Sequence, residues 1–204
     1  MAIGVKDLVV QAYGAEMKMI PYETIYFDFN QAGIRPEGQV VLQELAQYYQ
    51  RHPGLAIEIN AFADSLGNDQ YNYALSQQRG TSVFEQLLQQ GVNRSDVVIN
   101  AQGVSTARSS SHALVSQQLN RRVELSVVGR NLRYRPTTET RIPRPNVSLA
   151  QIAEQTGVSV ATLRALNGLD ETMEPFQPLR IPLVSDSVAA PLFYPMIQTQ
   201  PSNR

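Results

Sequence analysis

An acidic and a basic side chain flank one predicted loop, a pattern typical of a buried charge pair or of a site for a charged ligand. Asp64 follows an alternating apolar stretch, Leu55–Phe62, and Arg79 lies beyond the loop Ser65–Asn68. A carboxylate only accepts hydrogen bonds, whereas the planar guanidinium of Arg donates parallel bonds that match a carboxylate. Asp64 is therefore a candidate partner or co-ligand of Arg79, and the spacing alone leaves a structural Asp64–Arg79 bridge open.

A strand and a helix must position this pair. The alternation of apolar and polar residues over Leu55–Phe62 predicts a half-buried strand. The helix predicted after the loop carries residues at four-residue spacing on one face, namely Leu75, Arg79, Val83 and Leu87. Arg79 is thus expected on or beside the apolar stripe, where a charged group needs a partner.

This stretch resembles the core of the OmpA C-terminal-like domain, a peptidoglycan-binding family of bacterial envelopes. The family pattern is a strand, then G-H-T-D, a Gly loop, a Tyr/Asn pair and L-S-x-x-R-A. The corresponding positions here are Ala61–Asp64, Gly67, Tyr71–Asn72 and Leu75–Gly80. Flanking pieces also match, at Ile25–Asn30, Arg35–Gly38 and Asn120–Glu124. The resemblance covers roughly residues 22–129.

The resemblance implies a ligand and a role for each pocket residue. The family grips the free end of diaminopimelate in the stem peptide, which carries an ammonium and a carboxylate on one carbon. Asp64 would accept hydrogen bonds from the ammonium, and Arg79 would clamp the carboxylate. Arg121 would add positive potential. Asn30 and Leu75 would wall the pocket, although Asn30 fits equally well a turn that ends its strand.

Two departures from the family pattern stand directly before the acid. Phe62 and Ala63 stand where the family has His and Thr before the acid. These positions shape the pocket edge in relatives, so ligand choice or affinity is expected to differ here. On this hypothesis, Asp64→Ala or Arg79→Ala should abolish wall binding and leave the domain folded.

The predicted elements follow the order β-α-β-α-β-β. Helix crossovers between strands predict an α+β fold, with a mixed sheet and the helices on one face. Strands are expected at residues 24–30, 55–62, 97–101 and 121–128, with helices between Pro36 and His52 and between Asn68 and Gly91. The Ser- and Gln-rich residues 103–119 are expected to form a long loop.

Residues 140–184 form a second predicted unit with the order β-α-α-β. The unit resembles the LysM domain, which binds glycans that contain N-acetylglucosamine. The matching stretches are Ser148–Ala153, Gly157–Ser159, Leu163–Leu169 and Leu179–Pro182. By resemblance, Asn146, Val147 and Ser148 would hold the glycan. The family favours a Gly-Asp-(Ser/Thr) turn where this chain has Pro145–Ser148, which leaves the affinity for sugar open.

The predicted domain plan has five parts. It consists of a lead-in at 1–21, the OmpA-like domain at 22–129, a linker at 130–139, the LysM-like domain at 140–184 and a flexible tail at 185–204. The linker carries three basic residues, Arg130, Arg133 and Arg135, which fit either a solvated connection or contact with an acidic partner.

The composition excludes several classes of protein. The 204 residues carry a net charge of −1, which argues against bulk attraction to nucleic acid. The chain has no Cys, so it has neither disulfides nor a Cys that accepts lipid. No apolar run is long enough to span a bilayer. The N-terminus lacks the layout of a signal peptide, so either an export signal has been removed or another route leads to the periplasm or cell envelope.

No catalytic motif or cofactor site is visible. The sequence has no metalloprotease motif, no phosphate loop and no nucleophile elbow, and its His residues are isolated. We therefore expect a non-catalytic protein that anchors a complex or membrane to peptidoglycan, with no cofactor. The alternatives are a structural adapter that binds envelope or injection-machine proteins, and a wall hydrolase with an unrecognised carboxylate pair.

Overall fold

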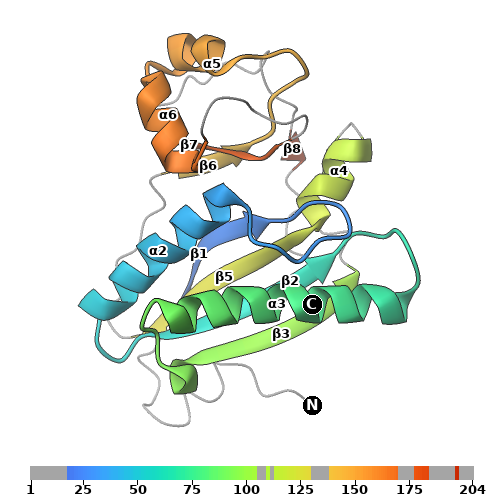
Figure 1. Cartoon of the computed structure of the whole chain (residues 1–204), viewed down its shortest axis with the longest axis vertical. Coiled ribbons are helices and arrows are strands. Elements are labelled where there is room, and N and C mark those ends of the chain that lie inside the picture. The colour runs from blue at the N-terminus through green and yellow to red at the C-terminus, as the bar shows by residue number, and fades with distance from the viewer. Residues whose placement is uncertain are drawn as a thin grey trace.

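The structure, a computed structural model, describes residues 18–104, 109–110, 113–129, 138–169, 177–183 and 196–197 of the chain. A sheet covered by two long helices forms the larger unit, and a small β-α-α-β unit lies beyond the start of the first helix (Figure 1). Each of the two units has its own apolar core.

The larger sheet is mixed, with the spatial order β1-β5-β2-β3. Its strands are β1 (Lys18–Tyr26), β2 (Ala56–Ala63), β3 (Val97–Val104) and β5 (Arg122–Gly129). β2 and β3 run parallel because a helix crosses over between them, whereas β5 pairs antiparallel with both β1 and β2. The predicted α+β fold with a mixed sheet is confirmed.

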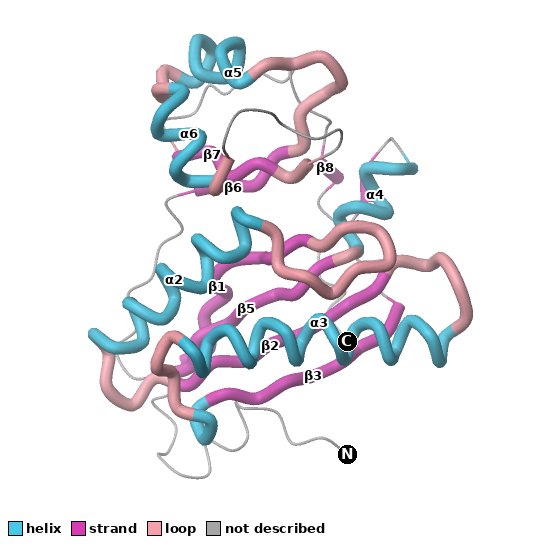
Figure 2. The backbone as a smooth tube through the Cα atoms, in the orientation of Figure 1, coloured by secondary structure: helices cyan, strands magenta, loops and turns pink. Residues whose placement is uncertain are grey.

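Two helices, α2 (Pro36–Arg51) and α3 (Asp69–Gln89), cover one face of this sheet (Figure 2). Proline at the first position of α2 suits a helix start, because the missing N–H would have no partner there. Asn68 caps α3, its side chain accepting a hydrogen bond from the backbone N–H of Tyr71 at 2.8 Å. Local sequence therefore sets where both helices begin.

Strand alternation gives the sheet an apolar side and a polar side. On β2, Ile57, Ile59 and Ala61 are fully buried beneath the two helices. On the opposite side the Asn100 amide donates a hydrogen bond to Glu58 at 2.8 Å. Because the period of a strand is two, the alternation predicted for β2 places these two sets on opposite faces.

A 3-10 turn, η1 (Arg94–Asp96), leads into β3.

β1 begins and ends earlier than the sequence predicted. It starts at Lys18 and stops at Tyr26, instead of spanning 24–30. The chain turns immediately afterwards, because the backbone N–H of Gln31 donates to the carbonyl of Asp28 at 3.2 Å. Asn30 lies in this turn with a left-handed φ of 57°. Asn30 thus adopts the turn that the sequence offered as the alternative to a role in the ligand pocket.

A short helix, α4 (Ala113–Asn120), occupies part of the predicted long loop. Its side chains Val115 and Leu119 are fully buried in one cluster with Tyr26 and Ile142. These two apolar residues are spaced as on one helix face, a signal that the polar composition around them concealed. The loop prediction was wrong for this segment.

Residues 196–197, near the end of the chain, pair with a strand that follows β3. β8 (Met196–Ile197) pairs antiparallel with β4 (Ser109–Ser110). These residues therefore belong to a two-stranded sheet and not to a flexible tail. The rest of the predicted tail, the lead-in up to residue 17 and the basic residues Arg130, Arg133 and Arg135 lie outside the described residues.

The smaller unit has the predicted β-α-α-β order. Its elements are β6 (Thr138–Arg141), α5 (Leu149–Thr156), α6 (Val160–Asn167) and β7 (Leu179–Pro182). Ser148 caps α5 through a capping box with Gln151, and Ser159 caps α6. The strands pair antiparallel, and the helices pack on them around an apolar core of their own.

The smaller unit docks on α2 and β1 of the larger one. The Arg180 guanidinium donates to Glu44 at 2.7 Å, and the Thr138 hydroxyl donates to Glu23 at 2.9 Å. Ile142, just after β6, joins the cluster that contains Tyr26 and α4. The predicted linker therefore ends within a strand, since Thr138 already belongs to β6.

Gly80 lets α3 lie close to the sheet. A Cβ there would lie 2.7 Å from Cγ2 of Ile99 and 3.4 Å from Cβ of Ala61. We predict that Gly80→Ala lowers the free energy of unfolding by about 1–3 kcal/mol, because overpacking outweighs the better helix propensity of Ala.

Urea denaturation monitored by circular dichroism measures this change. Gly33→Ala is the control, because a Cβ at Gly33 would meet nothing within 4 Å. Equal stability of Gly80→Ala and the wild type would contradict the close packing.

Gly168 allows the smaller unit to touch the larger one. It ends α6 with φ of 58°, and a Cβ there would lie 2.9 Å from the Pro36 backbone. Gly157 ends α5 with a similar φ of 69°, but nothing lies within 4 Å of its Cβ position. We predict that both Ala variants lose about 1 kcal/mol from left-handed strain, and that only Gly168→Ala loosens the docking.

Amide chemical shifts along α2 report the docking. They are expected to move in Gly168→Ala and to stay in place in Gly157→Ala. Identical α2 spectra for the two variants would mean that Gly168 has no part in the contact.

Candidate functional site

The structure gathers all five residues that the sequence proposed for the first site around one pocket of about 200 Å³. The pocket lies between the turn after β1, the loop after β2 and the first turns of α3. Its lining consists of Phe29, Asn30, Asp64, Leu66, Gly67, Tyr71, Asn72, Leu75, Arg79 and Arg121. Strand ends and a helix start therefore build it, as the sequence pattern suggested.

Asp64 is held in place at the end of β2 by two different bonds. One carboxylate oxygen, Oδ1, accepts the backbone N–H of Leu66 at 3.1 Å, and the other accepts Nη1 of Arg121 at 3.0 Å. The residue is only 5% exposed. Each carboxylate oxygen has a second acceptor position, so a cation entering the pocket still finds an acceptor.

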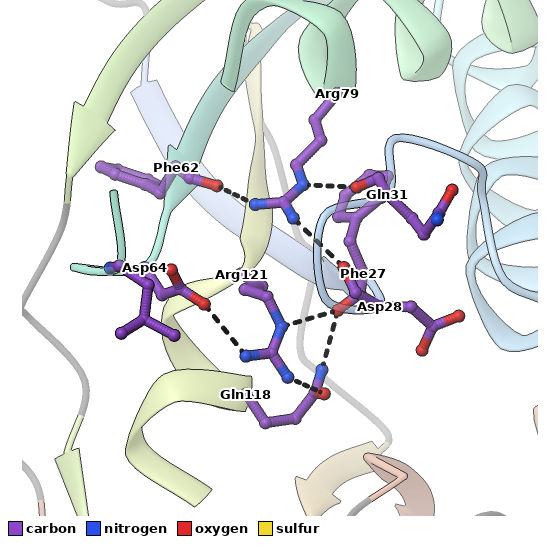
Figure 3. Close-up of polar contacts among 9 residues, drawn as sticks. Phe27, Asp28, Gln31, Phe62, Asp64, Arg79, Gln118 and Arg121 are labelled. Atoms are coloured by element: carbon purple, nitrogen blue, oxygen red, sulfur yellow. Dashed lines mark hydrogen bonds and ion pairs between the residues drawn. The ribbon is translucent and has the colours of Figure 1, made fainter. Parts of the chain in front are cut away.

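Arg79 lies beneath the pocket and is 0% exposed. Its guanidinium donates to three backbone carbonyls, those of Gln31 at 2.9 Å, Phe62 at 3.0 Å and Asp28 at 3.3 Å (Figure 3). It also stacks over the Phe27 ring, 5.2 Å from the centroid. Arg79 therefore ties the turn after β1 to the end of β2.

The surroundings of the Arg79 guanidinium lower its pKa. Burial, together with the nearby positive charge of Arg121, lowers its pKa to about 10. Arg79 is still protonated at neutral pH. Its burial on the apolar stripe of α3 agrees with the sequence prediction, but its bonding partners are carbonyl groups and not Asp64. No ion pair joins Asp64 to Arg79, although both residues are within the described part of the chain.

Arg121, which was expected only to add potential, is the ionic partner of Asp64 (Figure 3). It lies between α4 and β5, where its Nη2 donates to the Gln118 side chain at 2.6 Å and its Nε to the carbonyl of Phe27 at 3.3 Å. Gln118 also donates to the same carbonyl at 3.1 Å. Sequence reasoning missed Gln118 because it assigned this segment to a loop.

The mouth of the pocket is largely apolar and exposed. Phe29 is 60% exposed and Tyr71 47%, and Leu66 lies beside them in the lining. The Tyr71 hydroxyl donates a hydrogen bond to the side chain of Asn30 and so joins the start of α3 to the turn after β1. Leu75 is buried in the wall. Asn30 and Leu75 therefore both line the pocket as predicted.

The two residues that replace the His and Thr of the family pattern do not line this pocket. The Phe62 ring lies against the buried guanidinium of Arg122, at 4.3 Å from its centroid, and only its carbonyl bonds to Arg79. Ala63 is fully buried. The His and Thr of the pattern are thus replaced by side chains that pack within the protein.

The loop proposed for glycan binding has mainly structural contacts. Ser148 uses its hydroxyl to cap α5, accepting the backbone N–H of Gln151 at 3.2 Å. Val147 packs against the core of the smaller unit. Asn146 is exposed and adopts a left-handed φ of 67°. Asn146 and Ser148 are both exposed, and of these two Asn146 is the one without a role in capping the helix.

The described residues contain no cluster of three or more His, Asp or Glu side chains arranged to hold a metal ion. Within the same ranges, no helix has the length and apolarity needed to cross a membrane.

Fold and site together define an α+β domain with a pocket at Asp64, joined to a small β-α-α-β domain. Residues 26–121 match the model of the OmpA family, and residues 148–182 match the model of the LysM domain. The chain therefore carries an OmpA-family domain followed by a LysM domain.

Named relatives match the first of these domains. Outer membrane protein A of Bordetella avium is 30% identical over 104 residues, which cover 51% of this chain and 54% of the relative. The peptidoglycan-associated lipoprotein of Agrobacterium fabrum is 37% identical over 70 residues, which cover 34% of this chain and 40% of the relative. The chain spans between about a third and about half of the length of the first curated relatives it matches.

Among solved structures, the peptidoglycan-associated lipoprotein from Burkholderia pseudomallei is similar to this chain at 32% sequence identity. The match covers 51% of this chain and 88% of that structure, with a TM-score of 0.48.

The carbonyl bonds of Arg79 change what its removal should do. Arg79→Ala would leave three backbone carbonyls without the buried guanidinium that donates to them. We predict a loss of about 3–5 kcal/mol in the free energy of unfolding, which departs from the sequence-based expectation that the variant stays folded.

Urea denaturation of the variant measures this loss. Arg94→Ala is the matched control, since Arg94 is an exposed arginine that rests on the Phe84 ring and should cost less than about 1 kcal/mol. A stability of Arg79→Ala close to that of the control would refute the structural role of Arg79.

Proposed function

We propose that the chain is a non-catalytic peptidoglycan-binding protein that anchors a complex or membrane to the bacterial cell wall. The observation that carries the proposal is the buried carboxylate of Asp64, fixed in the wall of a pocket beside two guanidinium groups. The names of the relatives, which include outer membrane proteins and peptidoglycan-associated lipoproteins, support the same site of action, the periplasm or cell envelope.

The charge balance of the pocket favours a zwitterion. Two guanidinium groups, of Arg79 and Arg121, accompany the single carboxylate of Asp64 in the lining. A ligand ammonium would add a donor to Asp64, and the carboxylate on the same carbon would offset the second positive charge. The free end of diaminopimelate presents both groups together.

The proposed roles of Arg79 and Arg121 in ligand binding differ from those in the sequence-based hypothesis. Arg121 is 9% exposed and Arg79 is 0% exposed, so Arg121 is the guanidinium that a ligand meets from the pocket. Arg79 supports the pocket from below and contributes its charge. Each guanidinium has five N–H donors, and each uses three of its nitrogen atoms in the bonds described.

The LysM domain would add a second contact with the wall through its glycan. Asn146 is exposed and would meet the glycan, whereas Val147 and Ser148 would hold the loop in shape. Two weak sites on one chain raise avidity by roughly 10²–10⁴ when both reach the same polymer.

One observation favours a second function, that of a structural adapter for envelope or injection-machine proteins. The charges of the pocket are already engaged in bonds within the protein, and exposed apolar side chains surround its mouth, namely Phe29, Leu66 and Tyr71. A site that had lost its ligand would keep such a network for stability. Binding to purified sacculi separates the two functions.

We predict that Asp64→Asn lowers binding to purified sacculi by at least about tenfold, because the isosteric amide removes the charge that attracts the ammonium. Co-sedimentation with sacculi measures the bound fraction. Asp69→Asn is the control, since Asp69 is an exposed acid in the first turn of α3 that does not line the pocket.

A soluble stem peptide refines this test. The wild type should bind a peptide ending in diaminopimelate more tightly than the same peptide with lysine, which lacks the second carboxylate. Unchanged sacculus binding by Asp64→Asn would reject the pocket assignment. Absence of sacculus binding by the wild type would favour the adapter, and release of soluble muropeptides would reveal a hydrolase.

A further inference from the structure

A second pocket, of about 250 Å³, lies where the two domains meet. Tyr22, Glu44 and Tyr48 line it from the OmpA-family domain, and Thr138, Leu166 and Arg180 line it from the LysM domain. It shares no lining residue with the pocket at Asp64. In Figure 1 this junction is where β6, β7 and α6 approach α2.

The buried guanidinium of Arg180 holds this junction together. The side chain is 4% exposed and donates to Glu44 at 2.7 Å and to the carbonyl of Leu166 at 3.3 Å. A carboxylate oxygen of Glu23 lies 3.8 Å from Nη2 of Arg180, the nitrogen that donates to Glu44. The Nε atom of Arg180 is buried and has no acceptor within the described ranges.

The charges around the pocket are balanced. Arg51 and Arg180 supply two positive charges, and Glu44 and the adjacent Glu23 supply two negative charges. A charged ligand would gain little from such a site. Burial, with the nearby carboxylate of Glu44, raises the pKa of Tyr22, so this phenol also stays neutral.

The remaining lining combines two aromatic side chains with planar polar groups. The rings of Tyr22 and Tyr48 lie 5.9 Å apart at a tilt of 45°, and Leu166 adds apolar surface. Gln47 and Arg51 place an amide and a guanidinium at the exposed edge. A sugar ring has the complementary surface, with C–H faces that pack on aromatics and hydroxyl edges that both donate and accept.

We propose that this interdomain pocket binds one ring of a neutral saccharide. The ring would contact both domains at once, so binding would also fasten the LysM domain to α2. The identification of the saccharide as part of the wall's glycan strand rests on the proposed function. The inference that the pocket binds a neutral saccharide rests on its lining residues alone. The volume suits a single ring, since drug-sized ligands occupy larger pockets of about 300–1,000 Å³.

Titration of the whole chain with chitotetraose, a peptide-free oligomer of N-acetylglucosamine, tests the proposal by calorimetry. Gln47→Ala and Arg51→Ala are expected to weaken binding by about 3–10-fold each, the loss of one hydrogen bond. Both residues are exposed, and neither belongs to the Arg180 contacts. Gln43→Ala, one turn earlier on α2 and outside the lining, should bind as the wild type does.

Two further variants separate this site from the others. Asp64→Asn should keep full affinity for the saccharide even if it loses sacculus binding, so the two proposals fail independently. If the wild type shows no saturable binding, or if Gln47→Ala and Arg51→Ala leave affinity unchanged, the interdomain site is overturned. Loss of binding in Asn146→Ala alone would place the sugar on the LysM loop and overturn it as well.

Discussion

The buried guanidinium of Arg79 is the contact on which the shape of the candidate site depends. Its three carbonyl acceptors come from the turn after β1 and from the end of β2, two segments that no regular hydrogen-bond ladder joins at that point. Only arginine offers several donors in one rigid plane, so one side chain can hold both segments. The pocket mouth, formed by those same segments, takes its geometry from this bond set.

A second network completes the site above Arg79. Arg121 joins Asp64 to Gln118 and to the carbonyl of Phe27, so that α4, β2 and the end of β1 converge on one guanidinium. Removing any member leaves another buried polar group without its partner, which costs more than the bond itself contributes. The site is therefore rigid before any ligand arrives, and binding would need little reorganisation.

The sequence was sufficient to predict the elements that periodicity controls. Alternation predicted β2, and the four-residue spacing of Leu75, Arg79 and Val83 predicted a buried face with an arginine on it. The hydrogen-bond partners of Arg79 were not predictable, because every residue has a backbone carbonyl and the sequence does not show which ones it contacts. The helix α4 was missed because Val115 and Leu119 lie among polar residues.

The relation between the two domains was also beyond sequence reasoning. The contacts of Arg180 with Glu44 and of Thr138 with Glu23 join residues far apart in the chain, and neither pair belongs to a motif. The pocket at that junction exists only once both domains are placed, which is why residue patterns within either domain gave no sign of it.

The position of β5 in the sheet has a mechanical consequence. The chain leaves the OmpA-family domain from β5, which lies between β1 and β2 and is hydrogen-bonded along both edges. The pocket lies at the opposite end of β2 and β5, so tension between the pocket and the second domain would load both antiparallel ladders in shear at once. Lys18 at the start of β1 pairs with Gly129 at the end of β5. Tension between these two residues would instead open the β1–β5 ladder one pair at a time.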